Sequence, residues 1–465
     1  MASCDLTLKN GLVVTPRGVI HGGVAIDGET ILQVDTDGVL PKGKRDIDVG
    51  GKVIFPGIID PHAHIGVGDN WGPEKMRSDF ATESRDAAIG GMTTFVTTTV
   101  FGRESRVEML RDGIVAGSEN SMIDFRLTPV MTIRSHLDEV KECVALGARS
   151  FKFFLGYNGA QAESFGMEAE GVPWDFFYQG CEALRAAGPQ AFATIHAEDP
   201  DVRDLLNDRM RGSERDDILQ AWHEACPNLT EPMQLYPAAL IAHELGVRVY
   251  AVHLSAAESV ELLRDLHGKG FQAVGETLSA FLYYTAAEAD EKGLGAYGKI
   301  QPPIRAARDR DALWHGIRDG TITNVGTDAQ QYTIASQEVG FWDARVGLGP
   351  VYATMFPAVY TAGVLGGRCT LEDVARVCCE NNARAFDMYP RKGVLQAGSE
   401  ADLFVFDPDA TRITRAADLE SASGYTIFEG EELGGWPELV LLRGTPIVED
   451  GAIVAGTAAG RHVPV

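Results

Sequence analysis

The feature that most constrains the fold is a regular alternation of short apolar runs with helix-period segments between residues 53 and 328. This alternation is typical of β/α units on a parallel sheet. The apolar runs cover residues 53–64, 93–97, 125–130, 150–154, 191–195, 247–252, 271–275 and 323–326. Eight such units predict a (β/α)8 barrel, which typically needs about 250 residues.

The two ends of the chain have a different hydrophobic pattern, with short apolar segments between turns and no helix pattern. Residues 6–14 hold Asn10-Gly11 between alternating apolar positions, which is a strong hairpin signal. Similar segments return at 401–407 and 438–444. We therefore expect an α/β protein with a TIM barrel over residues 56–387. Residues 1–55 and 388–465 should form a small β-sandwich domain.

Three further segments between the ends carry helix signals. In residues 255–266, Ser255 precedes Glu258 by three positions, as in a capping box. A helix pattern returns at 371–386. The segment 199–229, rich in Asp, Arg and Asn, is interpreted as a solvated helical excursion on the barrel rim, without an assigned chemistry.

Composition argues against several classes of protein. A net charge of −25 disfavours nucleic-acid binding, which depends on Lys and Arg neutralising phosphates. There is no signal-peptide pattern and no run of about 18 apolar residues, so neither secretion nor a membrane span is expected. Seven cysteines without a C-x-x-C suggest reduced thiols and a cytoplasmic protein.

Metal-ligand side chains recur where the predicted strands end. His62 and His64 close the first strand, and alternation on a strand would point both imidazoles to one side. The remaining candidates are Lys152 in the fourth strand, His196 and His253 at the ends of the fifth and sixth, and Asp328 after the eighth. Because barrel active sites form at the C-terminal ends of strands, we expect these six residues to converge.

Each candidate taken alone has a structural explanation. The His-x-His pair could be solvated, and His196 or His253 could be a core histidine bonded to backbone. Lys152 could extend to solvent, and Asp328 could cap a turn. Their joint occurrence at strand ends favours a metal site instead.

The number of ligands indicates two ions. Imidazole and carboxylate suit zinc and similar divalent ions, and four histidines with one aspartate exceed what one catalytic ion with an open position needs. Two ions would need a bridging anion. Carbamylation of Lys152 by CO2 would supply one, a hypothesis that rests on the position of this lysine.

With these motifs the sequence resembles the amidohydrolase superfamily, and within it the dihydropyrimidinase/hydantoinase family. The resemblance spans nearly the whole chain and is carried by residues 56–64, 150–154, 196–198, 252–255, 274–276, 302–305, 326–328, 389–393 and 398–403. It implies a barrel with a β-sandwich, and two zinc-type ions bridged by carbamylated Lys152. It also implies hydrolysis of a hydantoin, dihydropyrimidine or related cyclic amide to a ring-opened N-carbamoyl or amide acid, in a homo-oligomer, commonly a tetramer, with a dimer as the other option.

The resemblance also implies roles for individual residues. Asp328 would take a proton from the attacking water and deliver it to the leaving ring nitrogen. Tyr157, five residues after Lys152, matches the family tyrosine that donates to the developing oxyanion. Phe154 would line the substrate pocket. Tyr157 as a wet rim residue and Phe154 as a core residue are the alternatives.

Departures from the family pattern concern the substrate. Gln301 stands where a serine commonly contacts the ring through its backbone, a contact that does not depend on the side chain because Pro302-Pro303 stiffens the loop. Ala329 replaces the usual histidine after Asp328, and residues 343–350 contain no asparagine to offer an amide to the ring.

Several related activities compete with this interpretation. Allantoinase and other cyclic amide or imide hydrolases share the ligand pattern. Dihydroorotase is disfavoured because Ile65-Gly66 follows His64 where that enzyme usually has an arginine for a carboxylate. Mononuclear deaminases need no bridging lysine. Some relatives are non-catalytic oligomeric interaction proteins, but those lack the metal ligands.

Overall fold

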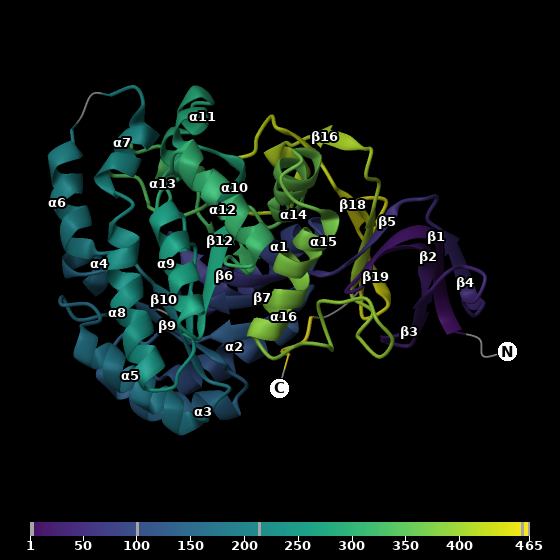
Figure 1. Cartoon of the computed structure of the whole chain (residues 1–465), viewed down its shortest axis with the longest axis horizontal. Helices are drawn as coiled ribbons and strands as arrows, with labels where there is room; N and C mark the ends of the chain where they lie inside the picture. Colours follow the sequence, from purple (N-terminus) through teal and green to yellow (C-terminus); the bar gives the residue numbers. More distant parts are fainter. Residues whose placement is uncertain (1–3, 99–101, 213–214, 457–459, 464–465) are drawn as a thin grey trace.

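The computed structural model describes residues 4–98, 102–212, 215–456 and 460–463. Figure 1 shows a helix-covered barrel beside a β-rich region that contains the N-terminus. The expected fold class, a TIM barrel with a smaller β-structure built from both ends of the chain, is confirmed.

All eight predicted barrel strands are present and run parallel to their neighbours. They are β6 (Ile58–Gly68), β7 (Met92–Thr98), β8 (Asp124–Thr128), β9 (Ser150–Phe154), β10 (Phe192–His196), β11 (Val249–Ala251), β12 (Ala273–Leu278) and β13 (Asn324–Gly326).

Two junctions complete the ring of strands. Between β8 and β9, Lys152 N–H donates to Pro129 O at 2.9 Å, and Met131 N–H donates to Lys152 O at 2.9 Å. Between β13 and β6, Asp328 N–H donates to His62 O at 2.8 Å. The second junction joins the first and last strands, so barrel closure itself brings Asp328 beside the His-x-His pair.

The outer helices follow from their apolar spacing. In α1, Pro73 occupies the first turn, and Met76, Phe80 and Ala87 are buried at helical spacing. The main helices are α1 (Pro73–Ile89), α2 (Arg106–Asn120), α3 (Val140–Ala145), α5 (Trp174–Ala187), α8 (Thr230–Glu244), α9 (Ala257–Gly268) and α12 (Ala307–Asp319). Short elements at the rim are α4 (Gly159–Ser164), α6 (Pro200–Met210), α7 (Ile218–Ala225), α10 (Ser279–Tyr283), α11 (Ala286–Glu291), α13 (Ile334–Gln337) and strand β14 (Ala329–Gln331). Helix α14 (Met355–Val359) is buried, and its Phe356 packs against Phe55 and Phe404 of the terminal sheet.

The helix predicted at 371–386 is confirmed as α15 (Leu371–Ala375) and α16 (Asn381–Ala385), joined by a π-helical turn over Arg376–Glu380. Thr370 and Asp373 form a capping box at its start.

Strands from both ends of the chain form one sheet of nine strands, seen at the right of Figure 1. They are β1 (Cys4–Thr15), β2 (Gly18–Asp27), β3 (Thr30–Asp35), β4 (Gly43–Asp48) and β5 (Val53–Pro56), with β15 (Leu403–Phe406), β18 (Pro437–Leu442), β19 (Thr445–Glu449) and β20 (Ala452–Ile453). The antiparallel pair of β5 and β15 connects the two ends. On this pair Ile54 and Val405 face a small core within the sheet region, whereas Phe55 and Phe404 pack into the main core.

The predicted hairpin at Asn10-Gly11 is wrong. Residues 4–15 form the single strand β1, and its register shifts between Leu8 and Gly11. Asn10 adopts a φ of 58°, and its amide donates to Asp48 Oδ1 at 2.8 Å. The left-handed residue makes a bulge, beyond which β1 pairs with β5 instead of β4.

The opening run, expected as one strand over 53–64, is split at Gly57. The part before it is β5 of the terminal sheet, and the part after it is the first barrel strand. A side chain at Gly57 would collide with Thr93, because its Cβ would lie 2.2 Å from Thr93 Oγ1. The chain therefore crosses between the two regions at a residue without a side chain.

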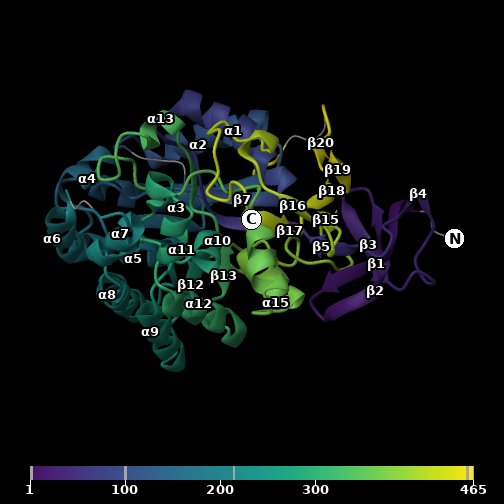
Figure 2. The same ribbon diagram turned by 90° about the horizontal axis from the view of Figure 1, so that it is seen from above.

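The C-terminal segment contributes to both regions. Strands β16 (Thr411–Ile413) and β17 (Glu432–Gly434) lie near the barrel rim, where Tyr284 Oη donates to Glu431 Oε1 at 2.9 Å. Further on, Phe125 N–H on β8 donates to Arg461 O at 3.0 Å. Figure 2 shows β15, β18 and β19 beside β5, on the side of the terminal sheet nearer the barrel. The domain division at residues 55 and 387 stays a prediction.

A buried ion cluster joins the two regions beneath the barrel. Lys392 Nζ lies 2.7 Å from Asp124 Oδ2, 2.7 Å from Glu400 Oε2 and 2.5 Å from Asp402 Oδ2. Asp124 begins β8, and Asp402 precedes β15. Three carboxylates around one ammonium raise the pKa of Lys392 despite its burial, so it stays charged.

Candidate metal centre

Six residues from different strand ends meet at the C-terminal mouth of the barrel. They are His62 and His64 on β6, Lys152 on β9, His196 at the end of β10, His253 two residues after β11, and Asp328 two residues after β13. All six are buried. The convergence predicted from strand order is therefore present in the fold.

Three of these residues form one compact group. His64 Nε2 lies 2.9 Å from Asp328 Oδ1, and His62 Nε2 lies 3.4 Å from the same oxygen. One ligand atom from each residue falls within 4.8 Å of the others. The alternating strand geometry accounts for this group, since both imidazoles of the His-x-His pair point to one side.

The other histidines form a second group, with Lys152 beside the first. His196 Nδ1 lies 2.9 Å from His253 Nε2. Lys152 Nζ lies 3.3 Å from His62 Nε2, and its side chain is fully buried, so the lysine does not extend to solvent. Burial lowers the pKa of Lys152 to about 8, partly opposed by Asp328 and Glu276.

The donor set fits divalent metal ions of the zinc type. Imidazole nitrogens and a carboxylate oxygen are the preferred ligands, and ring nitrogens from His196 and His253 face each other. His64 Nδ1, His196 Nε2 and His253 Nδ1 are buried and have no hydrogen-bond partner among the described residues. These are the outer nitrogens of the three rings. The opposite nitrogens face the ligand groups, with His64 Nε2 toward Asp328 and His196 Nδ1 toward His253 Nε2, so the fit to a metal ion rests on the inner nitrogens.

Glu276, near the end of the seventh strand, supports the ligands from behind. Its Oε1 lies 3.1 Å from His62 Nδ1 and accepts a bond from His253 N–H at 3.2 Å. Its Oε2 accepts from Tyr250 Oη at 2.7 Å. A carboxylate on the outer ring nitrogen fixes the orientation of His62 and leaves Nε2 for a metal.

Asp60 supports the opposite side in the same way. It accepts from Thr327 Oγ1 at 2.6 Å and from His62 N–H at 3.1 Å, so it connects the first and eighth strands directly behind Asp328. The backbones of His253 and Asp328 have φ values of 42° and 52°. Non-glycine residues rarely adopt this conformation, and it tends to be retained at functional sites.

An aromatic stack forms one wall of the cavity in front of these ligands. Tyr157 packs against Phe154 and Phe165, with ring centroids 5.0 and 5.1 Å away, and its ring is 4.9 Å from that of His196. The Tyr157 hydroxyl has no hydrogen-bond partner within the described part of the chain. Burial, with Asp328 nearby, raises its pKa, so the hydroxyl stays protonated and can donate.

Gln301 lines the same cavity and is tied to a buried carboxylate. Its Nε2 donates to Glu198 Oε2 at 2.8 Å. Arg203 Nη1 lies 3.2 Å from that oxygen and also donates to Gly156 O at 2.6 Å. Arg203 lies on α6 in the segment 199–229, where helices were predicted correctly. The segment was predicted to be solvated, and this prediction is wrong at Arg203. Its side chain is buried, where its guanidinium pairs with the buried carboxylate of Glu198.

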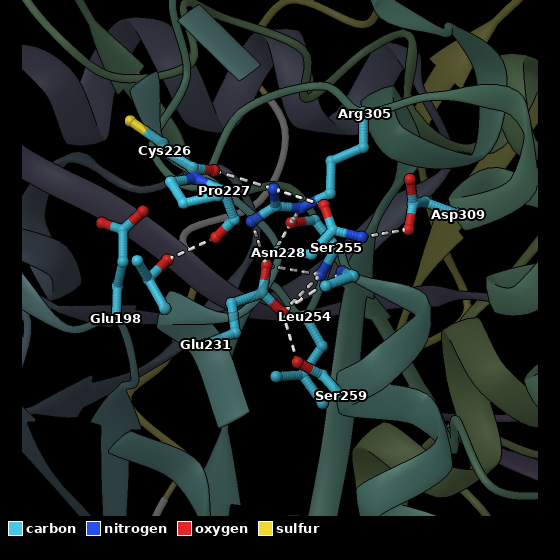
Figure 3. Close-up of polar contacts among 12 residues, drawn as sticks. Glu198, Cys226, Pro227, Asn228, Glu231, Leu254, Ser255, Ser259, Arg305 and Asp309 are labelled. Carbon is cyan, nitrogen blue, oxygen red and sulfur yellow. Dashed lines mark hydrogen bonds and ion pairs between the residues drawn. The ribbon is translucent and has the colours of Figure 1, made fainter. Parts of the chain in front are cut away.

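Figure 3 shows a second buried network, centred on Arg305, outside the ligand group. The Arg305 guanidinium donates to Glu231 Oε1, Asn228 Oδ1 and the Cys226 carbonyl, each at 2.9 Å, and to Ser255 Oγ at 2.7 Å. Arg305 follows the loop that carries Gln301, and Ser255 follows His253. The network therefore fixes the loop of Gln301 against the end of the sixth strand.

The capping box predicted at Ser255 and Glu258 is wrong. Helix α9 begins at Ala257, and no side chain of its N-cap residue makes a cap. Glu231 occupies the helix N-terminus instead, accepting from the backbone N–H groups of Ser255 and Ala256 and from Ser259 Oγ. A carboxylate from another helix has displaced the local cap, as a helix N-terminus attracts negative charge.

Sequence reasoning did not assign roles to Glu276, Asp60, Glu198 or the pair of Glu231 and Arg305. A carboxylate directly after the predicted seventh strand, 271–275, was a usable signal for Glu276, which lies two residues before the observed end of β12. The others could not be found this way, because their partners come from distant helices and loops.

A second group of acidic residues has a different character. Asp124, Glu400 and Asp402 lie close enough to hold an ion, but Lys392 already contacts all three. The ammonium satisfies this cluster, and its role is structural.

Comparison with known proteins agrees with the fold and the site. The model of the "Amidohydrolase family" matches residues 216–447. An L-hydantoinase from Paenarthrobacter aurescens is 27% identical over 462 residues, covering 99% of this chain and 98% of the relative. An allantoinase from Enterococcus faecalis is 27% identical over 451 residues, with 95% of each chain covered.

Among solved structures, an L-hydantoinase (dihydropyrimidinase) from Arthrobacter aurescens superposes with a TM-score of 0.87 at 27% identity, covering 97% of this chain and 98% of that one. The fold and the clustered ligands define a barrel hydrolase of the metal-dependent class. The chain belongs to the amidohydrolase family.

The Arg305 network leads to a stability prediction. Arg305→Met would leave the Glu231 carboxylate buried without its cation, and such a change costs about 3–5 kcal/mol in the free energy of unfolding. The double variant Glu231→Leu/Arg305→Met removes both charges and should be less destabilised than the single one. Urea unfolding measures both.

Arg308→Met is the matched control for this experiment, because Arg308 is an exposed arginine three residues further along the chain, in the first turn of α12. Its loss should cost below about 1 kcal/mol. An Arg305→Met protein as stable as the parent, or a double variant less stable than the single one, would contradict the assigned role.

Proposed function

We propose that the protein is a metal-dependent hydrolase that opens a ring by cleaving a cyclic amide bond in a hydantoin, dihydropyrimidine or related compound. The product is a ring-opened N-carbamoyl or amide acid. The observation that carries the proposal is the convergence of His62, His64, Lys152, His196, His253 and Asp328 in a family member whose hydantoinase relatives cover almost its whole length.

Bound divalent ions would lower the pKa of a bound water to about 7 and would polarise the ring carbonyl, as such ions do in other metal-dependent hydrolases. Two ions fit the two ligand groups, the first with His62, His64 and Asp328 and the second with His196 and His253. We infer that the ions are zinc or a similar divalent metal.

Asp328 moves the proton in this reaction. Its carboxylate lies among the imidazoles at the mouth of the barrel, where it can accept a proton from the attacking water and deliver it to the leaving ring nitrogen. Tyr157 supplies the donor for the developing oxyanion, because its hydroxyl is protonated and has no partner among the described residues. Phe154 and Gln301 bound the space for the ring.

Lys152 bridges the two ligand groups after carbamylation in this proposal. The neutral Nζ forms a bond to the carbon of CO2 and loses a proton, which gives a carbamate with one negative charge. Its burial next to His62 supports this assignment, because an uncompensated ammonium beside two metal ions would be strongly unfavourable.

An allantoinase is the nearest alternative, supported by the relative of that name. A non-catalytic interaction protein is the alternative from another class. The buried ligand set argues against it, since a scaffold has no need for six buried ligand-type side chains that meet at the mouth of the barrel.

We also propose a cytoplasmic location, supported by seven cysteines that are all free, six of them buried. No described helix combines the length and the apolar character that crossing a bilayer requires.

A panel of rings tests the function. Metal-replete protein should carry close to two ions per chain and convert hydantoin, dihydrouracil or allantoin, or a cyclic imide, to a ring-opened product seen by chromatography and mass spectrometry. Chelation should abolish turnover. Two bound ions with no product from any ring would refute the assigned activity while leaving the family assignment intact, and a protein without bound metal would favour the scaffold.

The carbamate has its own test. Protein stripped of metal should regain activity more fully with zinc and bicarbonate than with zinc alone in CO2-free buffer. With 13C-bicarbonate, one labelled carbon per chain should bind in the parent and none in Lys152→Arg. Equal recovery without bicarbonate, or equal labelling of the variant, would exclude the carbamate.

We propose that copies of the chain associate through α8, as a dimer or tetramer. Leu229, Met233, Tyr236 and Leu240 form a stripe along one side of this helix, with exposed fractions between 43 and 48%. A two-fold axis can pair such a stripe with its own copy. Figure 1 shows α8 on the outer surface of the barrel, away from the terminal sheet.

Light scattering should give the mass of a dimer or a tetramer of the 50.1 kDa chain. Met233→Lys/Leu240→Lys should lower it, because two buried charges would oppose association. Val115→Lys, at an equally exposed apolar position on α2, should leave the mass unchanged. A monomeric parent protein would rule out the association.

A further inference from the structure

The cavity presents two glutamine side chains that the proposed reaction does not use. Gln301 and Gln330 both line it, together with His64, His196 and Asp328. Gln301 is a departure from the family pattern, and Gln330 lies on β14, two residues after Asp328. Their hydrogen bonds determine what each amide can still offer a substrate.

Gln301 offers an acceptor. Its Nε2 is committed to Glu198 Oε2 at 2.8 Å, and a carboxylate can only accept, so this contact fixes the orientation of the amide. Arg203 Nη1 lies 3.2 Å from the same oxygen, so Glu198 Oε2 faces two donor groups. The opposite end of the amide, Oε1, is turned away from Glu198 and has no partner among the described residues.

Gln330 offers a donor. Its Oε1 accepts from the Tyr332 hydroxyl at 2.9 Å, which is the shorter of the two contacts of that hydroxyl; the other is to Val346 O at 3.2 Å. The Nε2 end is left for another partner. That end lies over Gly347, which also lines the cavity: a Cβ on Gly347 would be 2.9 Å from Gln330 Nε2. The lack of a side chain at Gly347 keeps the amide accessible.

One free acceptor and one free donor match a ring edge that carries an N–H beside a carbonyl. We propose that Gln301 and Gln330 select cyclic ureides over cyclic imides, with Gln330 Nε2–H donating to the carbonyl that is not cleaved and Gln301 Oε1 accepting from the ring N–H beyond it. This inference rests on the proposed ring-opening function and specifies its substrate class.

The remainder of the cavity agrees with an uncharged, flat ring. Lys152 is the only Lys or Arg among the described residues that line it, and Phe154, Tyr157 and Phe165 provide a stacked aromatic wall. An imide ring has a methylene where the ureide has the second N–H. It would leave the Gln301 acceptor buried and unpaired, which is the situation that makes a polar site reject an analogue.

Dihydrouracil and glutarimide form the test pair, since both contain a six-membered ring with the same cleavable imide linkage and differ in the second N–H. The measured quantity is the ratio of kcat/KM for dihydrouracil to kcat/KM for glutarimide. This ratio should be on the order of 10- to 100-fold larger in the parent than in Gln301→Met. Gln330→Met should lower kcat/KM for both rings alike, because both have the second carbonyl. Gln179→Met, at an exposed position on α5, is the control and should change neither value.

Binding provides a second measurement. Calorimetry on the Asp328→Asn variant, which should bind without turnover, should show the same preference for dihydrouracil and its loss when Gln301→Met is added. If the parent opens both rings and Gln301→Met leaves their ratio unchanged while folded, as judged by circular dichroism, the glutamine assignment is wrong and the ring-opening function stands. If metal-replete parent opens neither of these rings nor any other ring of the panel, the proposed function itself fails.

Discussion

The site depends first on the closure of the barrel between its first and last strands. The hydrogen bond from Asp328 N–H to His62 O joins β13 to β6, and Asp60 reinforces it by accepting from Thr327. Ligands separated by more than 260 residues in sequence become neighbours only because this junction forms. Their spacing is set by backbone hydrogen bonds of rigid strands, which position a catalytic group more accurately than loops do.

Much of this arrangement was accessible from sequence because it follows from periodicity. Strand alternation gave the common direction of His62 and His64, and the rule that barrel sites lie at C-terminal strand ends gathered Lys152, His196 and His253 around them. The same rules could not foresee Glu231 or Arg305, because a buried ion pair is recognised only when both elements are placed. Local signals failed where tertiary partners competed: Asn10-Gly11 became a bulge, and Ser255 lost its capping role to Glu231.

Substrate recognition was the least predictable part for a related reason. Ligand positions depend on strands, whereas Gln301 and Gln330 derive their chemistry from the partners of their amide ends. Glu198 and Tyr332 decide which end of each amide is free, and neither contact follows from spacing in the sequence. In the sequence, a glutamine can act as both a hydrogen-bond donor and an acceptor. In the fold, Gln301 has only its acceptor oxygen left for a substrate, and Gln330 has only its donor nitrogen.

Recognition and metal binding are also linked through one carboxylate. Glu198 Oε2 accepts from Gln301, contacts Arg203, and lies 3.5 Å from His196 Nε2, the nitrogen opposite the one that faces His253. A carboxylate near the outer ring nitrogen makes a histidine a stronger ligand. Glu198 therefore contacts both the glutamine that we propose to hold the ring and a histidine of the ligand set. The ion pair with Arg203 holds this shared carboxylate in place, so the proposed substrate contact and the second ligand group are positioned by the same buried group.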